Sequence, residues 1–406
     1  MKFHKFSIVT ISLLTSLSFI GCGSSDSTDD SESETSTKEI STDKTYSVQP
    51  YLRVAELDGN WDSVPEVAEK IAKYIHETDE STSLNFPTNW IIAGAETDLE
   101  TEKDILNIPL QDGNITRNIK MIELCNKKYA IMAVETGNFH SSALPCQVSV
   151  HSENGKILVD ILNPEAIFSL FFYDLSKSEK TALKTVALDV KREIKEMIYS
   201  GLESNFTKTE IGMGSKYNES QFENLHKKSP FKVDNYTSQN KEFSKADLTL
   251  IANKIIEKLG NKDNPSNVQG LSDGSLWHSV REVGVPIPNS QVIEAISPKY
   301  AKMITAFGVE YATVLPFELS VTRKNGDNKT LQISYLNPEY MLKVMLGESV
   351  VTNELIGLSK IISDDLSKIV DEAIKELKNE GTMTLSQKIP ENTQVPTPPA
   401  NMTEIQ

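Results

Sequence analysis

Apolar and polar residues alternate along the chain with two periods, one typical of helices and the other typical of strands. In residues 63–75 the apolar positions recur every three or four residues behind a capping-box sequence, which predicts a helix. The segments 146–151 and 156–161 are expected to be strands joined at Asn154-Gly155, a dipeptide that supplies the positive φ values of a tight hairpin. The pattern therefore predicts helices mixed with antiparallel strands.

Two longer amphipathic helices are predicted behind nearly identical start signals. Asn163-Pro164-Glu165 and Asn337-Pro338-Glu339 each place Asn at the N-cap and Pro at the first helical position. Apolar residues then recur at helical spacing, which is the usual pattern of a helix that packs on a core. These positions are Leu183, Val186, Val190, Ile194 and Met197 in the first helix and Leu355, Leu358, Ile362, Leu366, Ile369 and Leu377 in the second.

The two helix starts belong to a longer internal repeat. Residues 122–150 align with residues 293–321 without a gap, and about a third of the aligned positions are identical. After a turn that is three residues longer in the second copy, Leu162-Asn163-Pro164-Glu165 matches Leu336-Asn337-Pro338-Glu339. The chain is therefore predicted to carry two copies of one small domain.

The repeat and the composition around it predict the domain organisation. The two copies extend over residues 46–204 and 244–380. Between them, residues 205–243 are polar, rich in Asn, Ser and Lys, and weakly periodic, which is typical of a linker. The C-terminal residues 381–406 are rich in Pro and are expected to be extended and disordered.

The N-terminal residues predict export rather than a fold element. Residues 1–21 combine a positively charged start with a short apolar run, as a signal peptide does. Phe19-Ile20-Gly21-Cys22 resembles a bacterial lipobox, in which the cysteine is acylated and becomes the new N-terminus, although Phe19 stands where Leu is usual. Residues 22–45 are rich in Ser, Thr, Asp and Glu and are expected to be a disordered acidic tether.

The lipobox resemblance implies a cell-envelope protein that is lipid-anchored through Cys22 and exposed to the periplasm or the exterior. The alternatives are an uncleaved membrane anchor and an ordinary cleaved signal in which Cys22 has no role. No later segment has an apolar run long enough to span a bilayer. We therefore expect the lipid alone to hold the protein at the membrane.

Charge excludes one class of partner. The chain has 41 basic and 57 acidic residues, a formal net charge of -16, and the acidic excess is spread along its length. Without a basic stripe to neutralise phosphates, nucleic acid is not expected to bind. The partners that remain are the membrane, through the lipid, and an unknown small molecule or envelope protein.

Two cysteines are the main candidates for chemistry beyond the anchor. In an oxidising compartment Cys125 and Cys146 could form a disulfide, could be buried inert thiols, or could include a reactive thiol. His140 could pair with Cys146 as a base only if the fold brings them together; otherwise the scattered histidines are interpreted as surface residues. Their spacing predicts no metal site. We predict no catalytic residue and no cofactor.

The segments around these cysteines resemble a known family. Cys125-Asn126-Lys127-Lys128-Tyr129, Leu144-Pro145-Cys146 before a strand, the Asn-Gly hairpin and Leu162-Asn163-Pro164-Glu165 resemble DUF302, a family of small bacterial and archaeal domains of unknown function. The second copy departs from the pattern at Ser297, where Asn is usual, and at Phe317, which stands where the first copy has Cys146. The family positions to which we give structural roles are Asn126, Leu144, Pro145, Asn163, Pro164, Pro298, Leu315, Pro316, Asn337 and Pro338.

The resemblance implies an α+β fold in each copy, with an antiparallel sheet backed by helices in a layout similar to the TATA-binding protein. Since domains of this family often pair as dimers, the two copies are expected to pack against each other as a pseudo-dimer. Two functions stay open: a non-enzymatic binding or interaction module with a groove between the sheets, and a thiol-dependent redox or carrier protein that uses Cys125 and Cys146.

Overall fold

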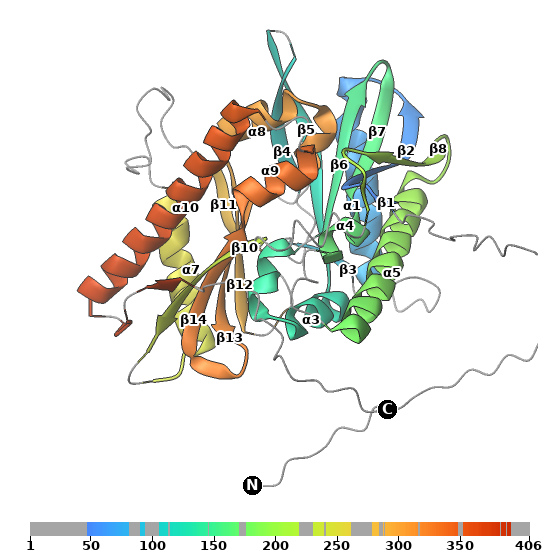
Figure 1. Cartoon of the computed structure of the whole chain (residues 1–406). Helices are drawn as coiled ribbons and strands as arrows, with labels where there is room; N and C mark the ends of the chain where they lie inside the picture. The colour runs from blue at the N-terminus through green and yellow to red at the C-terminus, as the bar shows by residue number, and fades with distance from the viewer. Residues whose placement is uncertain are drawn as a thin grey trace, which may run out of the picture. The chain divides into compact units, whose positions relative to one another are not determined.

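The first copy forms an antiparallel sheet whose strands lie in the order β3-β5-β6-β7-β2-β8, with β4 also paired to β5 (Figure 1). In the computed structural model these strands are β2 (Tyr51–Asp58), β3 (Trp90–Ile92), β4 (Ile105–Asp112), β5 (Ile115–Asn126), β6 (Cys146–Glu153), β7 (Lys156–Leu162) and β8 (Thr207–Met213). Its helical segments are η1 (Trp61–Ser63), α1 (Val64–Glu80), α3 (Lys127–Glu135), η2 (Asn138–Ala143), α4 (Pro164–Ser169) and α5 (Lys177–Leu202).

The second copy repeats this order, since its sheet runs β11-β12-β13-β14-β10-β15. The strands are β10 (Phe231–Thr237), β11 (His278–Val283), β12 (Ser290–Ile296), β13 (Phe317–Lys324), β14 (Asp327–Leu336) and β15 (Ile389–Pro390). The helices are α7 (Lys245–Gly260), α8 (Pro298–Thr305), η3 (Val309–Val314), α9 (Pro338–Leu346) and α10 (Asn353–Asn379). The predicted α+β class and the internal duplication are confirmed.

The structure describes most of the chain from residue 47 to residue 390, which belongs to one compact unit. The described residues are 47–80, 90–93, 105–112, 114–144, 146–169, 176–218, 230–238, 241–260, 278–283, 287, 289–315, 317–347, 352–381, 383–386 and 388–390. The signal peptide, Cys22 and the acidic tether lie outside them. Across this described part, no helix combines the length and apolarity that crossing a bilayer requires.

One face of each sheet carries the long helices and the main apolar core. In the first copy, α1 packs on α5 and on strands β5 and β6, with Ile71 and Ile194 fully buried between them. In the second copy, α7 and α10 pack together, and α7 lies on β12 and β13 (Figure 1). The apolar stripes predicted for α5 and α10 are buried as core.

Local start and turn signals form as their residues predict. The Asn163 side chain accepts from the amide of Glu165 at 3.1 Å, and the Asn337 side chain accepts from the amide of Glu339 at 3.2 Å. At the first hairpin, Asn154 and Gly155 have φ values of 52° and 77°, the positive angles that this two-residue loop needs.

The three extra residues of the second copy do not lengthen its turn. Both hairpins close with a two-residue loop, because Glu153 is in register with Lys156 and Lys324 with Asp327. The extra residues instead shift the register within β14 near Arg323. There Asn328 and Lys329 accept backbone hydrogen bonds from Phe243 and Ser238 at 2.8 Å each.

The linker prediction is wrong for part of residues 205–243. Strand β8 extends the first sheet along β2, and β10 is an inner strand of the second sheet, between β14 and β15. Strand β8 is an exposed edge strand with little apolar alternation, so its sequence gives a weak strand signal. In addition, the short strand β9 (Tyr217–Asn218) pairs with β1 (Ser47–Val48).

The start of the Pro-rich tail is also ordered, contrary to the prediction for residues 381–406. Ile389 of β15 is in register with Asn235 of β10. Lys388 forms ion pairs with Asp234 at 2.7 Å and with Asp371 at 3.3 Å. These charge contacts and the strand pairing fix a segment that has too few apolar residues to be recognised from its sequence. Residues after 390 lie outside the described part.

Candidate functional site

The second face of each sheet carries polar side chains that are nevertheless buried. On β6 of the first copy, Gln147, Ser149 and His151 alternate with Val148 and Val150, which lie on the core face. On β13 of the second copy, Glu318, Ser320 and Thr322 alternate with Leu319 and Val321 in the same way. We call these two surfaces the polar faces.

Each polar face is covered by a 3-10 helix of the other copy. Segment η2 of the first copy lies on β13 and β14, and η3 of the second copy lies on β6 and β7. Hydroxyl groups meet across both contacts: Ser290 Oγ donates to Ser141 Oγ at 2.7 Å, and Ser149 Oγ lies 3.2 Å from Thr313 Oγ1. The groove expected between the sheets is therefore filled at these points.

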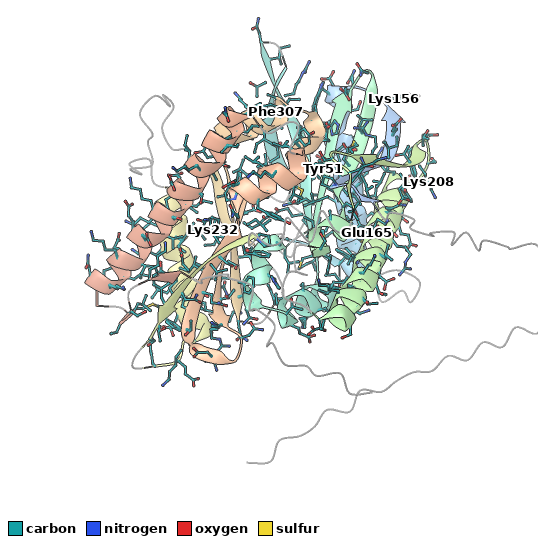
Figure 2. All side chains as sticks on the ribbon, in the orientation of Figure 1. Tyr51, Lys156, Glu165, Lys208, Lys232 and Phe307 are labelled. Carbon is teal, nitrogen blue, oxygen red and sulfur yellow. The ribbon has the colours of Figure 1, made fainter. Side chains whose placement is uncertain are left out.

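Aromatic contacts repeat the same reciprocity. Tyr51 of β2, labelled in Figure 2, meets Tyr311 of η3 edge to face with ring centroids 5.5 Å apart. Phe231 occupies the place of Tyr51 in the second sheet, and its ring lies 5.1 Å from that of His140, the counterpart of Tyr311. Because residue i contacts j and the counterpart of j contacts the counterpart of i, the contact has the form of an isologous interface.

A row of four buried polar residues crosses the centre of this contact. Gln147 Nε2 donates to Glu318 Oε1 at 2.7 Å, and the repeat makes these two residues counterparts of each other. Glu123 is in register with Gln147, and Glu294, the counterpart of Glu123, is in register with Glu318. We call Glu123, Gln147, Glu318 and Glu294 the axial row.

The axial row is unusual because three of its members are carboxyl groups with almost no access to water. Glu123 and Glu294 are 0% exposed, Gln147 is 3% exposed and Glu318 is 7% exposed. Burial, together with the charge of Glu294, raises the pKa of Glu318 well above its ordinary value. Such a carboxyl group keeps its proton to a higher pH than an exposed glutamate does, and a change in its surroundings changes its affinity for that proton.

A second buried cluster lies beside the axial row in the first copy. Arg53 forms two hydrogen bonds with Asp160, from Nε to Oδ1 at 3.0 Å and from Nη2 to Oδ2 at 3.3 Å. His151 Nε2 lies 3.6 Å from Asp160 Oδ2, and within the described residues neither ring nitrogen of His151 has a hydrogen-bond partner. We call Arg53, His151 and Asp160 the ionic cluster.

Burial sets the protonation of this cluster. It lowers the pKa of His151 to about 3, with a further contribution from the charge of Arg53, so the imidazole is neutral. Burial raises the pKa of Asp160 to about 6 despite the bond from Arg53. Glu310 of the second copy faces the cluster from η3, and burial raises its pKa as well. A carboxyl group of the second copy therefore interacts electrostatically with this cluster of the first copy.

The two cysteines are free thiols on neighbouring strands. Cys146 is in register with Leu124, so Cys125 projects from the opposite face of the sheet and its Cβ cannot approach that of Cys146 as a disulfide requires. Burial raises the pKa of both thiols, to about 12 for Cys146 although that residue keeps some exposed surface. Thiols that stay protonated are poor nucleophiles.

The histidine interpretation needs correction at two positions. His140 and His151 are both fully buried instead of lying on the surface. His140 does not act on Cys146 in the described structure; its Nδ1 lies 2.7 Å from Thr136 Oγ1 and 3.3 Å from the Ala133 carbonyl oxygen. His76 is half-buried, whereas the side chains of His4, His226 and His278 lie outside the described residues. Among the residues described, no group of three His, Cys, Asp or Glu side chains is placed to bind a metal.

The positions given structural roles hold the ends of helices and the core. Asn126 caps α3 by accepting from the amide of Lys128 at 3.0 Å, and Ser297 caps α8 in the same place. Leu144 and Leu315 are buried, while Pro145 and Pro316 lie outside the described residues. The remaining positions are Asn163 and Asn337 at N-caps and Pro164, Pro298 and Pro338 in the first turns that follow.

In both copies a tyrosine of the repeat lies near an acid of the long helix. Tyr129 donates to Glu193 Oε1 at 2.6 Å, and Trp90 Nε1 donates to Glu193 Oε2 at 2.8 Å. In the second copy, burial and then the charge of Asp365 raise the pKa of Tyr300, the counterpart of Tyr129. The sequence repeat contains Tyr129 and Tyr300 but not their partners, which belong to the long helices.

Sequence reasoning missed the axial row and the ionic cluster. One signal was available, because Ile122-Glu123 and Ile293-Glu294 are identical in the repeat and each places a carboxylate inside an apolar strand. Burying a charged side chain costs free energy unless it is paired or hydrogen-bonded. Its presence at the same place in both copies therefore points to a role. For Arg53 and Asp160, by contrast, no spacing connects the residues, since 107 positions separate them.

Comparison with known proteins identifies both copies. The family model described as "Domain of unknown function DUF302" matches residues 110–200 and 273–379. A crystal structure of an uncharacterized conserved DUF302 protein from Bacillus stearothermophilus is similar at 14% identity, covering 37% of this chain and 95% of that chain with a TM-score of 0.25. No curated protein matches this chain.

Proposed function

Because the chain belongs to the DUF302 family through two regions, and the function of that family is unknown, we propose a function from its own geometry. The chain is a non-enzymatic interaction module of the cell envelope in which two DUF302 domains act as one paired unit. It is held at the membrane by a lipid on Cys22 and meets an envelope protein or a small molecule there.

The observation that carries this proposal is the reciprocal contact between the copies. The pairs Tyr51–Tyr311 and Phe231–His140 repeat one contact at two places, and Gln147 meets its own counterpart Glu318. Residues that cover the polar face of the other copy fix the position of one domain against the other. A binding site confined to one copy would not need this arrangement. Linking two domains in one chain also raises their effective concentration to the millimolar range.

The thiol-dependent alternative has weaker support. A redox or carrier function needs a thiolate that is exposed and has a lowered pKa. Burial instead raises the pKa of Cys125 and of Cys146, and the second copy has Ile296 and Phe317 at the matching positions. Apolar replacements at both positions fit thiols that fill space in a packed interior.

Fractionation of a Cys22→Ser variant tests the membrane part of the proposal. In cells that export the chain, the wild type should be found in the membrane fraction, and the variant should be soluble in the envelope fraction or remain as uncleaved precursor. Cys125→Ser is the matched control because it also removes a thiol but keeps the predicted anchor. A Cys22→Ser protein that is fully processed and still membrane-bound would overturn the lipid anchor.

Chemical cross-linking in intact cells tests the interaction part and separates the two functions. The wild type should form reproducible cross-linked species with envelope components. A variant with Cys125→Ile and Cys146→Phe, the residues of the second copy, should keep them. A Ser149→Trp variant, which places a large ring where the Ser149 and Thr313 hydroxyl groups lie 3.2 Å apart, should lose them. Retention by Ser149→Trp combined with loss by the double cysteine variant would favour the thiol function.

A further inference from the structure

The axial row brings two carboxyl groups together inside the contact between the copies. Glu294 and Glu318 are directly opposite each other on β12 and β13, which places their Cβ atoms about 5 Å apart. Both are buried, so two negative charges at this distance would repel each other without the screening that water provides. One proton on the pair removes that repulsion.

Polar and charged residues flank Glu318 on both sheets. From its own sheet it faces Glu294, and Arg281 of β11 is in register with Glu294 on the far side. From the first copy, Gln147 of β6 donates its amide to Glu318, and Glu123 of β5 is in register with Gln147. Gln147 is neutral, so the hydrogen bond that it donates brings no positive charge to Glu318.

We propose that the paired copies hold a proton on Glu318 and that loss of this proton loosens the contact between them. The proposal rests on the pairing proposed above and adds a condition under which the pairing weakens. A neutral Glu318 keeps the hydrogen bond from Gln147 and carries no charge toward Glu294. An ionised Glu318 adds a negative charge to the buried contact between the copies. Water that enters between η2, η3 and the polar faces would solvate this charge.

The sign of the effect follows from proton binding. Burial and Glu294 raise the pKa of Glu318 in the paired state, whereas separation returns it toward the ordinary value of 4.5. The paired state therefore binds more protons, and pairing weakens as the pH rises between these two pKa values. For one proton, the equilibrium constant for opening should increase about tenfold for each pH unit in this window.

Hydrogen exchange of the full chain measures this opening directly. Four backbone amides report whether η2 and η3 stay docked. His140 lies in η2 and Leu144 directly follows it, while Tyr311 lies in η3 and Leu315 directly follows it, and all four donate to carbonyl groups three residues earlier. Protection factors, corrected for intrinsic exchange, are compared from pH 5 to pH 9. The wild type should lose about tenfold protection per pH unit over part of this range, whereas Glu318→Gln should show no such step.

Two further variants make the test decisive. Gln147→Glu places a fourth carboxyl group in the row and should make the loss of protection with pH steeper, while the exposed control Glu69→Gln should behave as the wild type. The same pH dependence in the wild type and Glu318→Gln would overturn the proton proposal while leaving the pairing intact. Segments that lack protection at every pH would overturn the pairing itself.

Discussion

The polar faces of the two sheets occupy equivalent places but bury different kinds of polar group. The first face contains the ionic cluster of Arg53, His151 and Asp160. The second face has Val233, Thr322 and Ser334 at the matching positions, and Ser334 Oγ donates to the Phe139 carbonyl oxygen at 3.0 Å. The same sheet therefore accepts either a buried ion pair or neutral hydroxyl groups, so the charges are not needed to form the fold.

What the copies share is more informative than what separates them. Both retain a fully buried glutamate at the centre of the contact, Glu123 and Glu294, and both retain a tyrosine near an acid of the long helix. The copies have diverged at most other positions. At these positions, however, neither copy has replaced the glutamate or the tyrosine with an apolar residue.

Breaking the ionic cluster should have the largest effect. Asp160→Ala leaves the Arg53 guanidinium half-buried without its partner, which should lower the free energy of unfolding by about 3–5 kcal/mol. Ser334→Ala, the equivalent change in the second copy, should cost only about 1 kcal/mol. Urea denaturation of both variants measures the difference. The triple variant Arg53→Val, His151→Thr and Asp160→Ser should be close to wild type, and a loss as large as that of Asp160→Ala would contradict our reading of the comparison.

Removing the Tyr129 hydroxyl should have a smaller effect than breaking the ionic cluster. Tyr129→Phe deletes a 2.6 Å hydrogen bond to the Glu193 carboxylate, and bonds to charged groups contribute about 1.5–3 kcal/mol. The loss should appear as a lower urea midpoint with an unchanged denaturant slope. Tyr300→Phe tests whether the second copy depends on its pair to the same degree, and no change in either variant would show that the pair has another role.

The pH dependence of stability should separate His151 from Asp160. Burial lowers the pKa of His151 from 6.5 to about 3, so its contribution is complete above pH 6.5 and is lost as the pH falls toward 3. Burial raises the pKa of Asp160 from 3.8 to about 6, so its contribution is complete below pH 3.8 and is lost as the pH rises toward 6. Between pH 4 and pH 6 the contribution of His151 to the free energy of unfolding rises with pH while that of Asp160 falls. The two changes should nearly cancel.

His151→Thr removes one of these slopes and introduces the residue found in the second copy. The free energy of unfolding should then decrease with rising pH between 4 and 6, by up to about 1.4 kcal/mol per pH unit. Denaturation curves at several pH values measure the slope. If the variant and the wild type have parallel profiles, the two groups do not titrate as the structure indicates.

The smallest effect is expected at the thiols. Since burial raises the pKa of Cys125 and of Cys146, both should react slowly with a thiol reagent at pH 8 and rapidly once the chain is denatured. Cys146→Ala should lower the free energy of unfolding by about 1 kcal/mol. One thiol that reacts rapidly in the native protein would return the redox function to consideration.

The sequence predicted the elements that depend on local chemistry. The Asn caps at Asn163 and Asn337, the Asn154-Gly155 turn and the duplicated strand order all follow from signals within a few residues or from the repeat. Strand β8 and the ordered start of the tail escaped prediction because pairing with distant strands fixes them, not their own periodicity. The axial row escaped for a related reason, since 171 positions separate Gln147 from Glu318.

The reciprocal position of η2 and η3 also has a consequence for the order in which the chain can fold. The bond from the Asn138 amide to Asn325 Oδ1 joins residues 187 positions apart, and η2 rests on β13 and β14, which are synthesised long after it. Closing such a loop costs more entropy than forming a local hairpin, so these contacts form late. Until then, the polar face of the first sheet exposes Gln147, Ser149 and charged side chains, with apolar neighbours such as Met121, which is in register with Ser149. A chain that lacks its second copy therefore exposes a mixed polar and apolar surface, whose polar groups remain hydrated until η3 covers them.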